Sequence, residues 1–253
     1  FADPVQLKLA TSVPRESPWG LVLRTWQKAV KEKTKGEVTI ELFWNGTQGD
    51  EPAQMAKVKT GQLDGAVVTA VGLGVIDPGV NVLQSPGLYG SWAQLDKGRE
   101  ALRARFEQKF REQGFELVGW GDVGLDHLMS KGFGIKNPAD LKGKRAWVWR
   151  EDPVLPPLFQ LTGAVTVPTS LPEALPELST GNVTVISVSA LAAEQMQWSS
   201  RLDHLSLFVV APNIGGMVLS KKSLDALPAA AHLTRMDTGR VSAKALTDRI
   251  RAQ

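Results

Sequence analysis

The 253-residue sequence predicts an α/β fold of two lobes. Short stretches with strand-like alternation take turns with stretches of helical spacing, which is the order found in open parallel sheets. This alternation restarts in the second half of the chain, which indicates a second lobe. No low-complexity linker separates the halves. We therefore expect strands that cross between the lobes and a ligand cleft between them.

The first half of the chain alternates strand and helix signals. Residues 5–10 alternate apolar and polar side chains, as a half-buried strand does. Ser17 followed by Pro18 is typical of a helix start, and we expect that helix to end near Lys35. Further strands are expected at 38–43, 65–68 and 115–120, and further helices at 51–59 and 91–113.

The second half repeats the pattern after Asn137 and Pro138, which begin a short helical turn. Strands are expected at 145–149, 183–188 and 215–220, and helices at 154–161, 190–198, 221–227 and from about Ser242. The expected division is 1–123 with 208–236 for lobe I and 124–207 with 237–253 for lobe II, with the last helix spanning the lobes.

Composition excludes several classes of function. The chain has no cysteine, so cysteine nucleophiles, disulfides and thiolate metal sites are impossible. Its three histidines lack zinc-ligand spacing, and it has no phosphate loop or nucleophile elbow. The net charge of +3 is not gathered into a basic stripe, which argues against nucleic acid as a partner. We expect a binding protein without cofactor, metal or catalytic residues.

Two further expectations concern processing and membranes. The apolar runs are strand-length and too short to span a bilayer. The chain starts at Phe1 without a signal-like segment, so we expect a product from which a signal peptide has been removed.

Five segments, in order, carry a family resemblance. They are LKLATSVPRESPWG (7–20), VTIELFWNGTQGDE (38–51), KVKTGQLDGAVVTA (57–70), GWGDVGLDHLMSKGFGIKNPADLKGKRAWV (119–148) and MVLSKKSLDAL (217–227). Together they resemble the extracytoplasmic solute-binding subunits of TRAP (tripartite ATP-independent periplasmic) transporters, of the dicarboxylate-receptor-like type. The resemblance implies a two-lobe periplasmic binding protein fold with a hinge of crossing strands and an interlobe ligand cleft. It also implies a periplasmic location and the membrane permease subunits of the transporter as partners.

The chain departs from the family pattern at three places where the family contacts its substrate. Typical members bind the substrate carboxylate with an arginine, and Trp147 takes its position here. Asp126 replaces a second basic residue, and residues 184–188 replace a polar run. We therefore expect an atypical member that rejects organic acids and binds a neutral, largely hydrophobic, lipid-like ligand. The resemblance to the subset that lacks this arginine also implies a TPR-containing periplasmic partner.

Eight residues are the expected ligand contacts: Trp147, Asp126, Val188, Ile186, Tyr89, Trp149, Ser187 and Asn213. Glu51, Trp19 and Trp198 are lesser candidates. Three different interpretations stay open. Trp147 and Trp149, on alternate strand positions, can both be core residues. Several tryptophans with Asp126 can form an aromatic cage around a cationic amine. Trp147 can also fill the cleft itself, in an interaction module that has lost transport.

Overall fold

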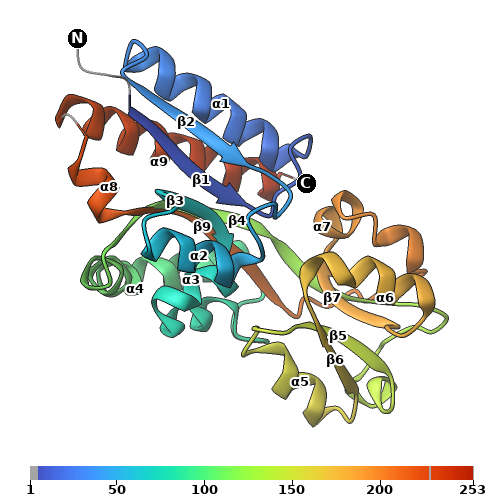
Figure 1. Cartoon of the computed structure of the whole chain (residues 1–253). Helices are drawn as coiled ribbons and strands as arrows, with labels where there is room; N and C mark the ends of the chain where they lie inside the picture. Colours follow the sequence, from blue (N-terminus) through green and yellow to red (C-terminus); the bar gives the residue numbers. More distant parts are fainter. Residues whose placement is uncertain (1–4, 228, 253) are drawn as a thin grey trace. The chain divides into compact units, whose positions relative to one another are not determined.

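The computed structural model describes residues 5–227 and 229–252, and of 229–236 it describes the backbone (Figure 1). The described chain forms two compact units. Unit 1 contains 5–80, 100–122 and the described residues after 213, and unit 2 contains 81–99 and 123–213. The predicted α/β class and the division into two lobes are confirmed.

The sheet of unit 1 has the strand order β2-β1-β3-β9-β4. β1 (Val5–Thr11) pairs in parallel with both β2 (Val38–Phe43) and β3 (Gly65–Thr69). β9 (Ala211–Ser220) pairs with β3 in the antiparallel direction. β9 and β4 (Phe115–Ser130) each contain residues of both units, so the chain passes from one unit to the other within strands, as the sequence predicted.

Helix α1 (Pro18–Lys33) begins where Ser17 and Pro18 predicted a helix start. The Ser17 hydroxyl accepts a hydrogen bond from the backbone N–H of Gly20 at 3.1 Å, and Pro18 occupies the first turn. Leu23 and Trp26 of this helix are fully buried against the strands. The other helices of unit 1 are α2 (Glu51–Lys59), α3 (Ala70–Ile76), α8 (Lys221–Asp225), α9 (Ala229–Arg251), the last thirteen residues of α4 (Trp92–Glu112) and part of the 3₁₀ helix η1 (Pro78–Gln84).

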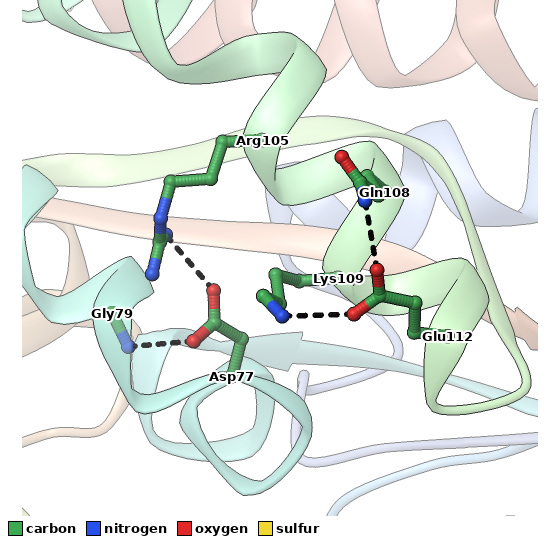
Figure 2. A network of polar contacts seen from close by, with 6 residues as sticks. All are labelled: Asp77, Gly79, Arg105, Gln108, Lys109 and Glu112. Atoms are coloured by element: carbon green, nitrogen blue, oxygen red, sulfur yellow. Dashed lines mark hydrogen bonds and ion pairs between the residues drawn. The ribbon is translucent and has the colours of Figure 1, made fainter.

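A polar contact fixes α4 to the end of α3 (Figure 2). Asp77, directly after α3, accepts hydrogen bonds from the Gly79 backbone N–H and from Arg105 Nη1 of α4, both at 3.0 Å. Farther along α4, Glu112 accepts from Lys109 and Gln108, each at 2.8 Å. The first contact joins separate elements, whereas the second lies within one helix turn at the surface.

The sheet of unit 2 has the strand order β4-β7-β5-β6. β4 pairs with β7 (Val185–Ser189) in the antiparallel direction, and β5 (Arg145–Trp149) runs parallel to β7 and β6 (Val165–Thr169). β8 (His204–Leu205) pairs with the other edge of β4. The helices are α5 (Leu155–Leu161), α6 (Ala174–Thr180) and α7 (Ala190–Gln195), with the 3₁₀ turns η2 (Pro138–Leu141), η3 (Leu171–Glu173) and η4 (Ser199–Arg201). α5 lies on one face of this sheet and α6 and α7 on the other (Figure 1).

The structure adds elements that the sequence pattern did not predict. β6 contains Pro168, which removes a backbone donor and argues against a strand, but β6 is the last strand in the order, where proline is tolerated. α9 begins at Ala229, whereas the sequence predicted a start near Ser242. The prediction was too late because Gly239, inside the helix, interrupts the helical pattern of the sequence. A Cβ on Gly239 would lie 2.2 Å from Val118 Cγ1 of β4, so close packing explains the glycine. α3 and α6 were not predicted either.

The boundaries between the units differ from the expected ones. The sequence assigned residues 237–253 to lobe II, whereas contacts group the described part of this segment with unit 1. The reason is that α9 packs beside α1, within unit 1 (Figure 1). Residues 81–99, expected in lobe I, group with unit 2.

Candidate functional site

Trp147 lies in the middle of β5, and only 5% of its surface is exposed. Its indole Nε1–H donates a hydrogen bond of 2.8 Å to the hydroxyl of Thr169 on β6. Its ring centroid lies 5.5 Å from that of Trp198, which follows α7. These two contacts fix the orientation of the ring toward the side of the sheet that α7 covers.

The strand pairing of unit 2 divides the predicted contacts between two faces. Ala146, Val148 and Val185 belong to the apolar core around Phe159 of α5. Because side chains alternate along a strand, their neighbours on β5 and β7 point to the opposite face. We call this opposite group the aromatic face: it consists of Trp147, Trp149, Ile186 and Val188.

The aromatic face is almost completely buried. Ile186 is fully buried, and Val188 and Trp149 are 4% and 7% exposed. The Nε1–H of Trp149 is buried and has no hydrogen-bond partner among the described residues. This face offers apolar and aromatic contact, with one indole N–H still unsatisfied.

His127 is a polar residue of this region that the sequence analysis did not name as a contact. It stands opposite Val188 on β4, and the alternation of the strand turns it toward the aromatic face. Its Nδ1 lies 3.0 Å from the carbonyl oxygen of Ser206. Since a carbonyl oxygen only accepts, Nδ1 carries a proton in this contact.

The other predicted contacts of this sheet lie on the core side. Leu128, a core residue, stands opposite Ser187, and Asp126 stands opposite Ser189, the last residue of β7. Asn213 of β9 donates from Nδ2 to Asp126 Oδ2 at 3.3 Å. We call Asp126, Ser187 and Asn213 the polar group. Of this group, Asp126 lies opposite the carboxyl end of β7, and the carboxyl ends of parallel strands are where α/β folds bind ligands.

The carboxyl group of Asp126 is buried with little compensation. Only 8% of the residue is exposed, and Oδ1 has no hydrogen-bond partner among the described residues. Burial, assisted by the nearby charge of Asp152, raises the pKa of Asp126 from 3.8 to about 7, although hydrogen bonds from the Asn213 side chain and the Ser189 backbone oppose the change. Burial also raises the pKa of Asp152, although Val154 and Leu155 donate backbone N–H groups to its Oδ1.

The remaining candidates have other surroundings. Tyr89 is half-buried and packs on α4. A Cβ on Gly98 of this helix would lie 2.6 Å from the Tyr89 hydroxyl. The described contact of Tyr89 is therefore with α4 rather than with the other candidates. Glu51 of unit 1 is 1% exposed and accepts hydrogen bonds of 2.8–3.0 Å from Thr69 and Gly72 at the start of α3. Trp19 is buried in the same unit.

Unit 2 also has a separate cavity of about 410 Å³ on the α5 side. Its lining is mainly apolar and includes Leu128, Ile135, Leu141, Phe159 and Phe208. The eight predicted contacts do not line it. A hollow of this composition accepts apolar groups.

Thr169 and Asp152 are the neighbours of the site that the sequence did not single out. Thr169 is the last residue of β6, a strand that the sequence pattern did not predict. Asp152 precedes α5 as an acidic residue at a helix start, which is a signal of capping rather than of binding. Within the described residues, no helix is both long and apolar enough to cross a membrane.

Comparisons with known proteins agree with this architecture. Residues 9–234 match the family model DctP, described as bacterial extracellular solute-binding protein, family 7. A solute-binding protein of Verminephrobacter eiseniae is 26% identical over 251 residues, which cover 96% of this chain and 72% of that protein. An extracytoplasmic solute receptor of Bordetella pertussis, solved with pyroglutamic acid, has a TM-score of 0.91 at 22% identity, covering 98% of this chain and 81% of that one. A TRAP periplasmic solute-binding protein of Sulfitobacter, solved with β-D-galacturonate, has a TM-score of 0.89 at 20% identity, covering 97% and 82%.

The family match spans most of the chain, and it bears out the resemblance that the sequence carries. The family consists of transport proteins rather than enzymes, its members act outside the cytoplasm, and they work with membrane permease subunits. This chain belongs to the DctP family, the periplasmic solute-binding proteins of TRAP transporters.

Proposed function

We propose that this protein captures a neutral, largely hydrophobic ligand and delivers it to the permease subunits of a TRAP transporter. The observation that carries the proposal is Trp147. At the position where the resemblance places a carboxylate-binding arginine, unit 2 has a buried indole fixed by Thr169 and Trp198.

The energetics of this exchange favour apolar ligands. A carboxylate taken out of water beside an indole, without a cation, is disfavoured by several kcal/mol. Apolar ligand surface gains roughly 25 cal/mol for each Å² removed from water. The buried carboxyl group of Asp126 in the same unit works further against an anion.

The acids bound by related structures define the competing proposal. Pyroglutamic acid and β-D-galacturonate are both carboxylic acids, and each is bound by a protein with about a fifth of its residues in common with this one. At such identity the likeness supports the fold, and the ligand follows the residues at the site. An acid-binding function here needs a cation near Trp147 in place of the missing arginine.

The aromatic cage and the interaction module agree with the geometry to different degrees. A cage of Trp147 and Trp149 closed by Asp126 is weakened, because alternation places the tryptophans and Asp126 on opposite faces of the sheet. The non-transport module agrees with the close packing of Trp147 on Trp198, and it predicts that no ligand is carried. A TPR-containing partner stays a prediction from the resemblance.

The test combines ligand identification with a pair of variants. Protein isolated from a native periplasm is extracted with organic solvent, and the extract is identified by mass spectrometry. We expect a neutral, lipid-like molecule. Trp147→Arg should weaken its binding at least about tenfold, because a cation replaces apolar contact, whereas Trp147→Phe should weaken it only a few-fold.

Two results would contradict the proposal. One is an organic acid in the extract, together with a thermal shift of the wild-type protein on addition of galacturonate. The other is unchanged lipid binding by Trp147→Arg. An empty protein that shifts with neither class of ligand would instead favour the interaction module.

A further inference from the structure

We propose that the cavity on the α5 side of unit 2 is a second binding site. It takes the aliphatic chain of an amphiphile and leaves an anionic head group beside Lys136 at its mouth. The site goes beyond the proposed function, because its lining contains core residues of the sheet face opposite Trp147. It therefore does not depend on the role of the aromatic face.

The first observation is that the cavity has a buried apolar floor and an exposed rim. Leu128 of β4, Leu141 of η2 and Phe159 of α5 line it and are buried members of one core cluster. Phe208 also lines it, and 43% of this residue is exposed, which places the ring at the mouth. A chain that enters past Phe208 thus meets apolar side chains throughout.

The walls of the cavity are held within one unit. All of its lining residues belong to 81–99 or 123–213, the two segments of unit 2. The backbone N–H of Gly87 donates to the carbonyl oxygen of Val210 at 3.0 Å, and both residues are part of the lining. This bond fixes two segments that are distant in the sequence on one wall of the hollow.

The size of the cavity suits an aliphatic chain. Its volume of about 410 Å³ lies within the range of about 300–1,000 Å³ that small-molecule sites occupy. An apolar cavity of about 150 Å³ already binds benzene, so this one has room for roughly ten or more carbon atoms. Water finds few polar partners on such walls, and apolar groups that displace poorly held water gain affinity.

The second observation is the charge at the mouth. Lys136 is exposed and is the charged residue of the described lining, which favours an anionic head such as a carboxylate or a phosphate. Asp140 is a neighbouring acid, and its Oδ2 accepts the backbone N–H groups of Lys136, at 2.8 Å, and Asn137, at 3.0 Å. Because its charge offsets part of that of Lys136, the preference should be only a few-fold.

The experiment measures octanoate, decanoate and decanol on the full chain by isothermal titration calorimetry. Carboxylates are the sharper probes, because the site proposed at the aromatic face disfavours them. Decanoate should bind about fifteenfold more tightly than octanoate, since each buried methylene contributes about fourfold. Lys136→Gln should weaken decanoate a few-fold and leave decanol unchanged.

A pair of variants on one helix places the chain in the cavity. Leu158 of α5 is partly buried and lines the hollow, so Leu158→Trp fills it and should weaken decanoate at least about tenfold. Leu161→Trp is the matched control, because Leu161 is on the same helix, 87% exposed and outside the lining. If Leu158→Trp does not fold, Phe208→Ser at the mouth provides the second measurement, with an expected loss of about threefold or more.

The outcomes decide between this site and its alternatives. Equal affinities for octanoate and decanoate overturn the proposal, as do equal losses in Leu158→Trp and Leu161→Trp. Decanoate binding that is weakened by Trp147→Phe and not by Leu158→Trp places the chain on the aromatic face and also overturns it. No probe binding, together with a dimer that Phe208→Ser abolishes, assigns the hollow to a second copy of the chain instead. The proposed function is tested separately, through the dependence of the neutral ligand on Trp147.

Discussion

Glu51 of unit 1 and Asp126 of unit 2 are both buried acids whose pKa burial raises to about 7, yet their surroundings differ. Glu51 accepts from the backbone N–H groups of Thr69 and Gly72 and from the Thr69 hydroxyl. Asp126 accepts one long side-chain bond from Asn213 and is assisted by the Ser189 backbone, while its Oδ1 has no partner among the described residues. A raised pKa therefore does not distinguish the two. The hydrogen bonds do: Glu51 is a structural residue that holds the start of α3, and Asp126 is a candidate for binding.

Removal of the two side chains should give the largest contrast. Glu51→Ala leaves the buried N–H groups of Thr69 and Gly72 without an acceptor, which should lower the free energy of unfolding by about 3 kcal/mol. Asp126→Ala removes a poorly satisfied carboxyl group and should lower it by less than about 1 kcal/mol, or raise it. Urea unfolding measures both. Equal losses for the two variants would remove the distinction between structural and binding acids.

The pH dependence of stability should sharpen the comparison. The folded state holds protons on Glu51 and Asp126 up to about pH 7, whereas the unfolded chain loses them near the ordinary values of 4.5 and 3.8. Stability from these groups is therefore full below about pH 4 and falls as pH rises toward 7. At pH 8 the melting temperature of Asp126→Asn should lie a few degrees above that of the wild type, because the variant has no buried charge at this position. This gain in melting temperature should shrink at pH 5, where Asp126 of the wild type is itself neutral. A gain that is the same at both pH values would contradict the raised pKa of Asp126.

A third acid provides the smallest expected effect. Asp77 is 9% exposed and accepts from Gly79 and from Arg105, whose side chain is 47% exposed (Figure 2). Arg105→Ala removes a partly solvated partner and should reduce the free energy of unfolding by about 1 kcal/mol or less. A loss as large as that of Glu51→Ala would show that partner number alone does not rank these acids.

Local signals predicted the parts of the fold that depend on neighbouring residues. Ser17 and Pro18 begin α1 as expected, and the alternation of 38–43 forms β2. β6 and the start of α9 escaped prediction because Pro168 and Gly239 are tolerated only through tertiary context, an edge position in one case and contact with Val118 in the other.

The sequence named candidate residues but not the arrangement of their side chains. Asp126 and Asn213 were both proposed as contacts, and the structure brings them together although 87 residues separate them. That Trp147 and Asp126 face opposite sides follows from strand register, which a single sequence does not reveal. The partners of Trp147 on β6 and after α7 depend on the same long-range pairing.

The opposite facing of Trp147 and Asp126 has a consequence for how such receptors diversify. With the sheet standing between them, a substitution near one leaves the packing of the other intact. The charge of this unit and its apolar wall can then change by separate substitutions, at position 126 for the charge and at position 147 for the wall.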